Sequence, residues 1–156
     1  MAASAHDRVV DDVLMTSRAL VSVAARSLAE TEDTVTLVQY RALVLLASRG
    51  AMNVGSLADA LNVHQSTATR LCDRLVSRGL VERDQSEQSR REVLVSLTGP
   101  GQELIRAVTA RRRAEIESVM ARLTERQRAA VAAAFRAFAE AAGEAPDDAW
   151  KLGWTA

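Results

Sequence analysis

The sequence predicts a mainly α-helical fold with one β-hairpin inserted among the helices. Through most of the 156 residues, apolar side chains recur at three- and four-residue steps, which is the pattern of amphipathic helices. Only two prolines and seven glycines occur in the chain. The period changes once, between residues 80 and 97, where the aliphatic runs "LVER" and "EVLVSL" flank a polar stretch. Such an arrangement is typical of a β-hairpin with a long, charged tip.

Two helices are expected before the middle of the chain. The first runs from Asp7 to about Ala29, with apolar residues on one face, and the segment "AETEDTV" ends it. The second begins at Thr36, because "TLVQ" is a capping box in which Gln39 reaches back to the start of the helix. Gly50 is the expected end, since glycine closes a helix without strain.

The next segment predicts a helix-turn-helix. After "AMNV", an expected short strand, the helix "SLADAL" ends at Asn62, a residue that tolerates the left-handed conformation of a tight turn. A second helix follows within "NVHQSTATRLCDRLVSRG" and ends at Gly79. His64, at its start, is expected to cap the helix or to contact phosphate. Two short helices joined by so tight a turn form the helix-turn-helix unit.

The second helix of this unit has two different faces. At 100° per residue, one face is aliphatic and is expected to pack in the core. That face consists of Ala68, Leu71, Cys72, Leu75 and Val76. The opposite face consists of Ser66, Thr67, Arg70, Arg74 and Ser77. Hydroxyls, amides and arginine can read base edges in the major groove of DNA, which admits one α-helix. A helix with such a face and no further support would more often be simply solvated.

The hairpin supplies that support, because a hairpin directly after a helix-turn-helix is a winged helix. Its tip carries two arginines, and an extended loop with arginine fits the narrow, negative minor groove. The formal net charge of the chain is zero, but residues 64–91 hold six arginines against four acidic residues. Binding to DNA is therefore expected to be modest per subunit and salt-dependent. The predicted DNA-contacting residues are Gln65, Ser66, Thr67, Thr69, Arg70, Arg74, Arg90 and Arg91.

Two further helices follow the hairpin. Thr98 is the expected N-cap of the first, with Pro100 in the first turn, where its missing N–H costs little. This helix is expected to span residues 101–123. "TERQ" at Thr124 repeats the capping box and begins a helix over residues 125–142.

The terminal helices predict a homodimer. They carry more apolar surface than a single winged helix can cover, and intertwined termini of two copies would bury it. The expected regions are a helical dimerisation region at 1–30 and 100–145, a winged helix-turn-helix at 36–98 and a tail at 146–156 that holds Trp150 and Trp154.

Other classes of function find little support in the sequence. Cys72 is the only cysteine, which excludes an internal disulfide, and it is expected to be a buried structural thiol. Two histidines give no zinc spacing, and no catalytic set or phosphate-binding loop is visible. We therefore expect no enzyme activity, no cofactor and no metal. The first thirty residues contain charges and no unbroken apolar run, which predicts a cytoplasmic protein without a signal peptide or membrane span.

Four segments of the chain resemble one known family. They are "QYRALVLLA", "SLADALNVHQSTATRLCDRLVSRGLVER", "SRREVLVSLT" and "LTGPGQEL". Together they are similar to the MarR (multiple antibiotic resistance regulator) family of bacterial transcription factors. The resemblance implies a regulator, expected to be a repressor, that binds a palindromic operator as a dimer with interlocked first and last helices. Its recognition helices would enter successive major grooves, and its wing arginine would enter the minor groove.

The resemblance also suggests residue roles. It assigns Ser66, Thr67, Thr69 and Arg70 to the major groove and Arg91 to the wing tip. The family wing usually has an aspartate two residues before that arginine, where this chain has Ser89. The wing is therefore expected to be looser, or Arg90 shares the role.

Many relatives are released from DNA by small aromatic or anionic molecules. The matching region here involves Met15, Arg18, Tyr40 and Met52, although 3% aromatic residues offer little stacking surface. A winged helix that serves only protein contacts is the alternative that the residues leave open.

Overall fold

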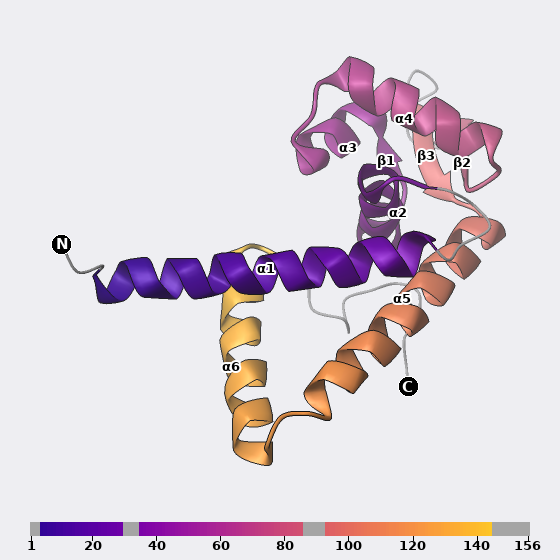
Figure 1. Ribbon diagram of the computed structural model, residues 1–156. Helices are drawn as coiled ribbons and strands as arrows, with labels where there is room; N and C mark the ends of the chain where they lie inside the picture. Colours follow the sequence, from indigo (N-terminus) through magenta and orange to yellow (C-terminus); the bar gives the residue numbers. More distant parts are fainter. Residues whose placement is uncertain (1–3, 30–34, 86–92, 145–156) are drawn as a thin grey trace.

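The computed structural model describes residues 4–29, 35–85 and 93–144 and confirms a mainly helical fold with one small sheet (Figure 1). The elements are α1 (Ala5–Ala29), α2 (Leu37–Arg49), β1 (Met52–Asn53), α3 (Val54–Leu61), α4 (Gln65–Ser77), β2 (Val81–Gln85), β3 (Val93–Leu97), α5 (Gly99–Met120) and α6 (Glu125–Ala141). The predicted hairpin tip and the predicted tail lie outside the described residues.

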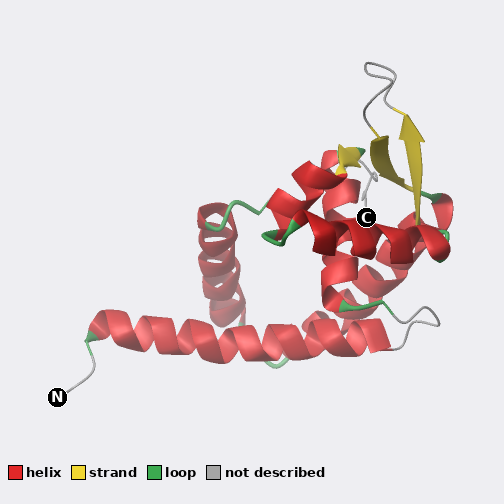
Figure 2. Ribbon diagram, turned by 90° about the horizontal axis from the view of Figure 1, so that it is seen from above, coloured by secondary structure: helices red, strands yellow, loops and turns green. Residues whose placement is uncertain are grey.

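The sheet is antiparallel, with the strand order β1-β3-β2. Val81 pairs with Leu97 in the hairpin, and Met52 of the two-residue β1 pairs with Val95. Figure 2 shows the hairpin projecting from the helices. The sheet therefore closes one side of the helix-turn-helix and extends it outward as a wing.

The core surrounds α2, in which every residue from Ala42 to Ala47 is buried. Leu57 of α3, Leu75 of α4 and Ile105 of α5 belong to the same fully buried cluster. An amphipathic helix is normally buried on one face only, so a helix buried all round must be covered by several neighbours. Here α3, α5, β3 and the end of α1 supply most of that cover, which makes α2 the centre of the winged helix.

The predicted helix ends are confirmed. The Thr36 hydroxyl accepts a hydrogen bond from the backbone N–H of Gln39, and the Gln39 side-chain oxygen accepts one from the backbone N–H of Thr36. Thr124 begins α6 with the same capping box. Thr98 caps α5 by accepting a hydrogen bond from the N–H of Gly101. Asn62 adopts the left-handed conformation at the end of α3, with φ 53° and ψ 48°.

Two details differ from the sequence-based expectation. Val76 was expected in the core but is 37% exposed, because it lies at the edge of the aliphatic face, past Leu75, where the helix leaves the core. The fifth helix ends at Met120 instead of residue 123, because the chain turns at once into the N-cap at Thr124.

The terminal helices lie largely outside the core. In Figure 1, α1, α5 and α6 enclose an open triangle, with the winged helix at one corner. Only the C-terminal part of α1 is buried, and α6 has no buried residue. Within the described residues, no helix combines the length and the apolar character needed to cross a bilayer.

The start of α5 is tied closely to the end of the helix-turn-helix. Thr98 donates one hydrogen bond through its N–H to the carbonyl of Leu80 and another through its hydroxyl to the carbonyl of Gly79. Gly101 faces the same carbonyl of Leu80 so closely that a Cβ atom there would collide with it. A glycine at residue 101 therefore allows the start of α5 to pack against the backbone of Leu80, just before β2.

We predict that Gly101→Ala lowers the free energy of unfolding by about 1–3 kcal/mol, because backbone atoms must shift to admit the methyl group. Denaturant unfolding at fixed protein concentration measures the change. Gly99→Ala is the matched control, since a Cβ at residue 99 meets nothing within 4 Å. Equal stability of the two variants would contradict the packing described here.

Candidate nucleic-acid interface

The turn between α3 and α4 fixes the orientation of the predicted recognition helix. The N–H of Val63 donates a hydrogen bond back to the carbonyl of Ala58, and His64 begins α4 in an extended conformation. His64 thus occupies the N-cap position, although its side chain makes no capping hydrogen bond. Ala68, Leu71, Cys72 and Leu75 are buried, so the aliphatic face of α4 is held against the core.

The opposite face of α4 is exposed along its whole length. This face carries the six predicted DNA-contacting residues of the helix, Gln65, Ser66, Thr67, Thr69, Arg70 and Arg74. One of them is partly engaged, because the Thr69 hydroxyl donates a hydrogen bond to the carbonyl of Gln65. Thr69 can therefore offer a partner its oxygen as an acceptor or its methyl group more readily than a donor.

A shallow cleft of about 250 Å³ brings a second element to this face. It is lined by Thr36, Val38 and Gln39 at the start of α2 and by Thr67, Arg70, Leu71 and Arg74 of α4. The free N–H groups and the dipole of a helix N-terminus favour a phosphate, as do two neighbouring guanidinium groups. Sequence reasoning found the capping box of α2 but had no means of placing it beside α4.

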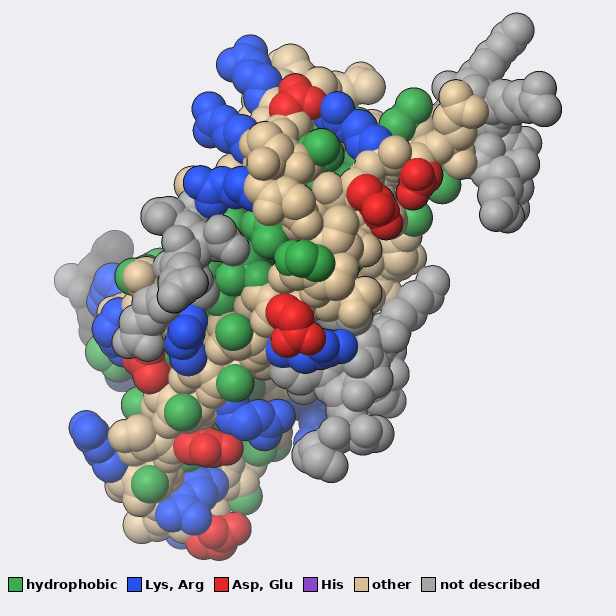
Figure 3. Space-filling model, turned by 90° about the vertical axis from the view of Figure 1, so that its right-hand side faces the viewer, with side chains coloured by type: hydrophobic (Ala, Val, Ile, Leu, Met, Phe, Trp, Pro, Cys, Tyr) green, Lys and Arg blue, Asp and Glu red, His purple; other side chains and the backbone are tan. Residues whose placement is uncertain are grey.

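The hairpin is joined to the recognition helix by an ion pair. Arg83 of β2 lies 2.7 Å from the carboxylate of Asp73 on α4. Figure 3 shows basic side chains at the top of the molecule, where the winged helix lies, and others along the rest of this face. Arg90, Arg91 and Ser89 lie outside the described residues.

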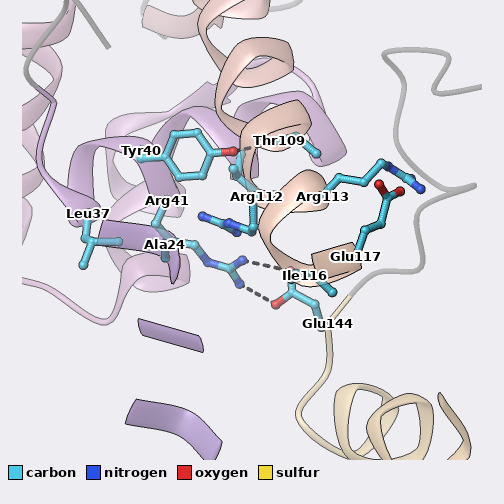
Figure 4. A pocket seen from close by; sticks show the side chains of 11 residues that line it. Ala24, Leu37, Tyr40, Arg41, Thr109, Arg112, Arg113, Ile116, Glu117 and Glu144 are labelled. Atoms are coloured by element: carbon cyan, nitrogen blue, oxygen red, sulfur yellow. Dashed lines mark hydrogen bonds and ion pairs between the residues drawn. The ribbon is translucent and has the colours of Figure 1, made fainter. Parts of the chain in front are cut away.

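A second feature is an open pocket of about 600 Å³ between the winged helix and α5 (Figure 4). The Tyr40 hydroxyl lies 3.2 Å from the hydroxyl of Thr109, and the guanidinium of Arg112 stacks 5.4 Å from the centre of the Tyr40 ring. Arg41 and Glu144 also line the pocket and form an ion pair there. Apolar residues complete its walls, namely Ala24, Leu37, Val44 and Ile116.

Of the four residues predicted to hold a small effector, only Tyr40 lines this pocket. Met15 and Arg18 are exposed on α1, and Met52 packs against the core from β1. Sequence reasoning missed Arg41 and Arg112. An arginine within the apolar run of α2, and the arginine triplet at residues 111–113, were the available signals.

The remaining candidates have structural surroundings. Cys72 is fully buried, and this burial raises the pKa of its thiol. Glu115 of α5 pairs with Arg26 of α1 at 2.6 Å. Among the described residues, no three His, Cys, Asp or Glu side chains come together in a group that could hold a metal ion.

Comparison with known proteins agrees with this geometry. The model of the MarR family matches residues 35–93. An HTH-type transcriptional regulator of Mycobacterium leprae is 38% identical over 92 residues, which are 59% of this chain and 62% of that protein. The HTH-type transcriptional repressor MdtR of Bacillus subtilis is 28% identical over 123 residues, covering 78% of this chain and 79% of the repressor. The chain covers about three fifths of the length of the first curated relatives that it matches.

A solved structure is similar over nearly the whole chain. The crystal structure of Rv1404 from Mycobacterium tuberculosis has a TM-score of 0.85 at 37% identity, covering 94% of this chain and 99% of that one. The helix-turn-helix, the paired hairpin and the exposed polar face together define a winged-helix protein. The chain belongs to the MarR family.

We predict that Cys72 in the native protein reacts only slowly with a water-soluble thiol reagent, because the reactive thiolate is disfavoured and shielded. Denaturant should make the reaction fast. The matched control is Ser77→Cys on the exposed face of the same helix, whose added thiol should react at once without denaturant. Rapid native labelling of Cys72 would contradict its structural role.

Proposed function

We propose that the chain is a DNA-binding transcriptional regulator that binds a palindromic operator as a homodimer, with α4 in the major groove and the wing in the minor groove. The observation that carries this proposal is the exposed polar face of α4, which is held outward by a fully buried aliphatic face. A rigid helix with hydroxyl, amide and guanidinium groups matches the donors and acceptors of base edges.

The roles of the α4 residues follow from their positions along the helix. Recognition helices contact bases mainly through their N-terminal residues, so Gln65, Ser66 and Arg70 would face base edges. Arg74 lies a turn further from the N-terminal end of α4, which suits it to a phosphate. Arg90 and Arg91 would enter the minor groove from the wing, as predicted from the sequence.

The proposed dimer explains the terminal helices. Apolar side chains of α1 and α6 line an open groove of about 610 Å³, among them Val9, Val13, Leu20, Phe135 and Phe138. Val9 is 60% exposed and Phe138 is 57% exposed. A contiguous apolar groove of this kind marks an interaction surface, and a second copy of the same helices would cover it. Two-fold symmetry would then place the half-sites about 10–10.5 base pairs apart, centre to centre.

We further propose repression as the outcome, with release by a small aromatic or anionic effector and action in the cytoplasm, where the DNA is. The similarity to the repressor MdtR supports the direction of regulation. The pocket at Tyr40 supports an effector, since it lies between the winged helix and the helices of the proposed dimer. An effector can shift the spacing of the recognition helices only as far as it binds one dimer geometry more tightly than another.

A winged helix that serves protein contacts alone is the second candidate. A mobility shift assay with the DNA upstream of the gene separates the two. A salt-sensitive complex that prefers one sequence over random DNA is expected, and its absence would favour the protein-contact function.

We predict that Arg70→Ala weakens binding to the operator by about 1–3 kcal/mol, as expected when a bidentate contact with a guanine is lost, and leaves the dimer intact. Binding to random DNA should change much less. Titration of both DNAs in the mobility shift assay gives the comparison.

Arg91→Ala is the contrasting variant, because loss of a wing arginine should weaken binding more evenly across sequences. An equal loss on operator and random DNA for Arg70→Ala would instead assign Arg70 to the phosphates.

We predict that Phe138→Glu converts the dimer to monomer at micromolar concentration, because a carboxylate would be buried in the apolar groove between α1 and α6. Sedimentation velocity measures the change. Val93→Glu is the control: Val93 is 46% exposed on the wing strand, away from the groove, and this variant should remain dimeric. A Phe138→Glu protein that stays dimeric would place the interface elsewhere.

A further inference from the structure

The pocket at Tyr40 contains a carboxylate of the chain itself. Arg41 donates two hydrogen bonds to Glu144, from Nη1 to Oε1 at 2.8 Å and from Nη2 to Oε2 at 2.7 Å. This bidentate arrangement is the one in which a guanidinium recognises any planar carboxylate. Figure 4 shows Glu144 reaching the pocket from the chain that follows α6.

The backbone holds Glu144 in this position. Gly143 has a φ of 72°, its N–H donates to the carbonyl of Glu140, and the N–H of Glu144 donates to the carbonyl of Ala139. These two hydrogen bonds form a Schellman motif, which fixes the residue after the glycine relative to the helix. The end of α6 therefore sets the position of the Glu144 backbone, and the hydrogen bonds with Arg41 place its carboxylate.

The rest of the pocket suits an anion with an apolar body. Arg41, Arg112 and Arg113 line it against only two carboxylates, those of Glu117 and Glu144. The Nε atom of Arg112 is shielded from solvent and has no hydrogen-bond partner among the described residues, so a donor remains unused beside the Tyr40 ring. The apolar walls can cover the remainder of a small ligand.

The internal ion pair is suited to exchange. The side chains of Arg41 and Glu144 are 45% and 43% exposed, and an ion pair as exposed as this contributes little stability. The hydrogen bonds from Arg41 lower the pKa of Glu144, which keeps its carboxylate charged and able to compete with another anion. An incoming carboxylate would restore both hydrogen bonds at Arg41, so the exchange leaves no buried charge unpaired.

We propose that Glu144 occupies the carboxylate position of a ligand site, and that a small molecule with a carboxylate on an aromatic or apolar body binds by displacing Glu144 from Arg41. The ligand class rests on the proposed function, since it specifies the effector of that regulator. Displacement would release the end of α6, in the proposed dimerisation region, from α2 at the centre of the winged helix. The exchange thus connects ligand binding to the relative position of these two parts.

Calorimetric titration of the full-length protein with benzoate tests this exchange. Glu144→Gln should bind benzoate roughly three- to five-fold more tightly than the unmodified protein, because the internal competitor is gone. The gain should vanish when Arg41→Gln is added to Glu144→Gln. Benzamide has the same ring without the charge. It should bind the unmodified protein and Glu144→Gln equally.

Glu115→Gln is the matched control. It removes the same charge and another exposed ion pair, with Arg26, but Glu115 does not line the pocket. This variant should bind benzoate as the unmodified protein does.

Three results would overturn the proposal: no gain in Glu144→Gln, an equal gain in Glu115→Gln or in the presence of Arg41→Gln, or no benzoate binding by any form. Mobility shifts on the same preparations report DNA binding separately. Failure of the unmodified protein to bind DNA would refute the regulator function while the benzoate titrations still decide whether Glu144 competes at Arg41.

Discussion

Burial of one face of α4 in the core, against α3 and β2, is the constraint on which the rest of the structure depends. Leu71, Cys72 and Leu75 lie in the same buried cluster as Leu43 of α2. Cys72, Leu75 and Leu43 are completely buried. Because a helix is rigid, fixing one face fixes the opposite face as well. The polar face of α4 is therefore presented outward in a defined orientation without any contact of its own.

The electrostatics of the chain are local. A formal net charge of zero gives no long-range attraction to DNA, and Asp73 already neutralises Arg83 beside the recognition helix. Attraction must then come from small groups of aligned charges, such as the α2 N-terminus with Arg70 and Arg74. This arrangement favours contacts in which these groups match the positions of DNA phosphates over a general affinity for anions.

The winged helix lies at one corner of the open triangle formed by α1, α5 and α6. The α6 helix has no buried residue in the single chain, and the contacts that join it to the other elements include the ion pair of Glu144 with Arg41. A second copy would supply the missing cover, and the position of α6 would then be shared between the dimer partner and the pocket. A ligand that competes for Arg41 would therefore change the contacts that hold α6 between the partner and the pocket.

The sequence by itself determined the helices, their caps, the hairpin and the two faces of α4. These features depend on residues three or four positions apart, as in the capping boxes at Thr36 and Thr124, so their physical causes can be read from short segments. The differences were local, such as the exposure of Val76, the first residues of α1 and α5, and the end of α5.

Only the tertiary structure decided which distant residues meet. The cleft between the start of α2 and Arg70, the Tyr40 pocket and the pairing of Arg41 with Glu144, 103 residues apart, all depend on how helices pack. A local pattern carries no information on such distances, because packing is set by the whole buried surface. The sequence therefore predicted the polar face of α4. The pocket at Tyr40 and the place of Glu144 in it became visible only in the tertiary structure.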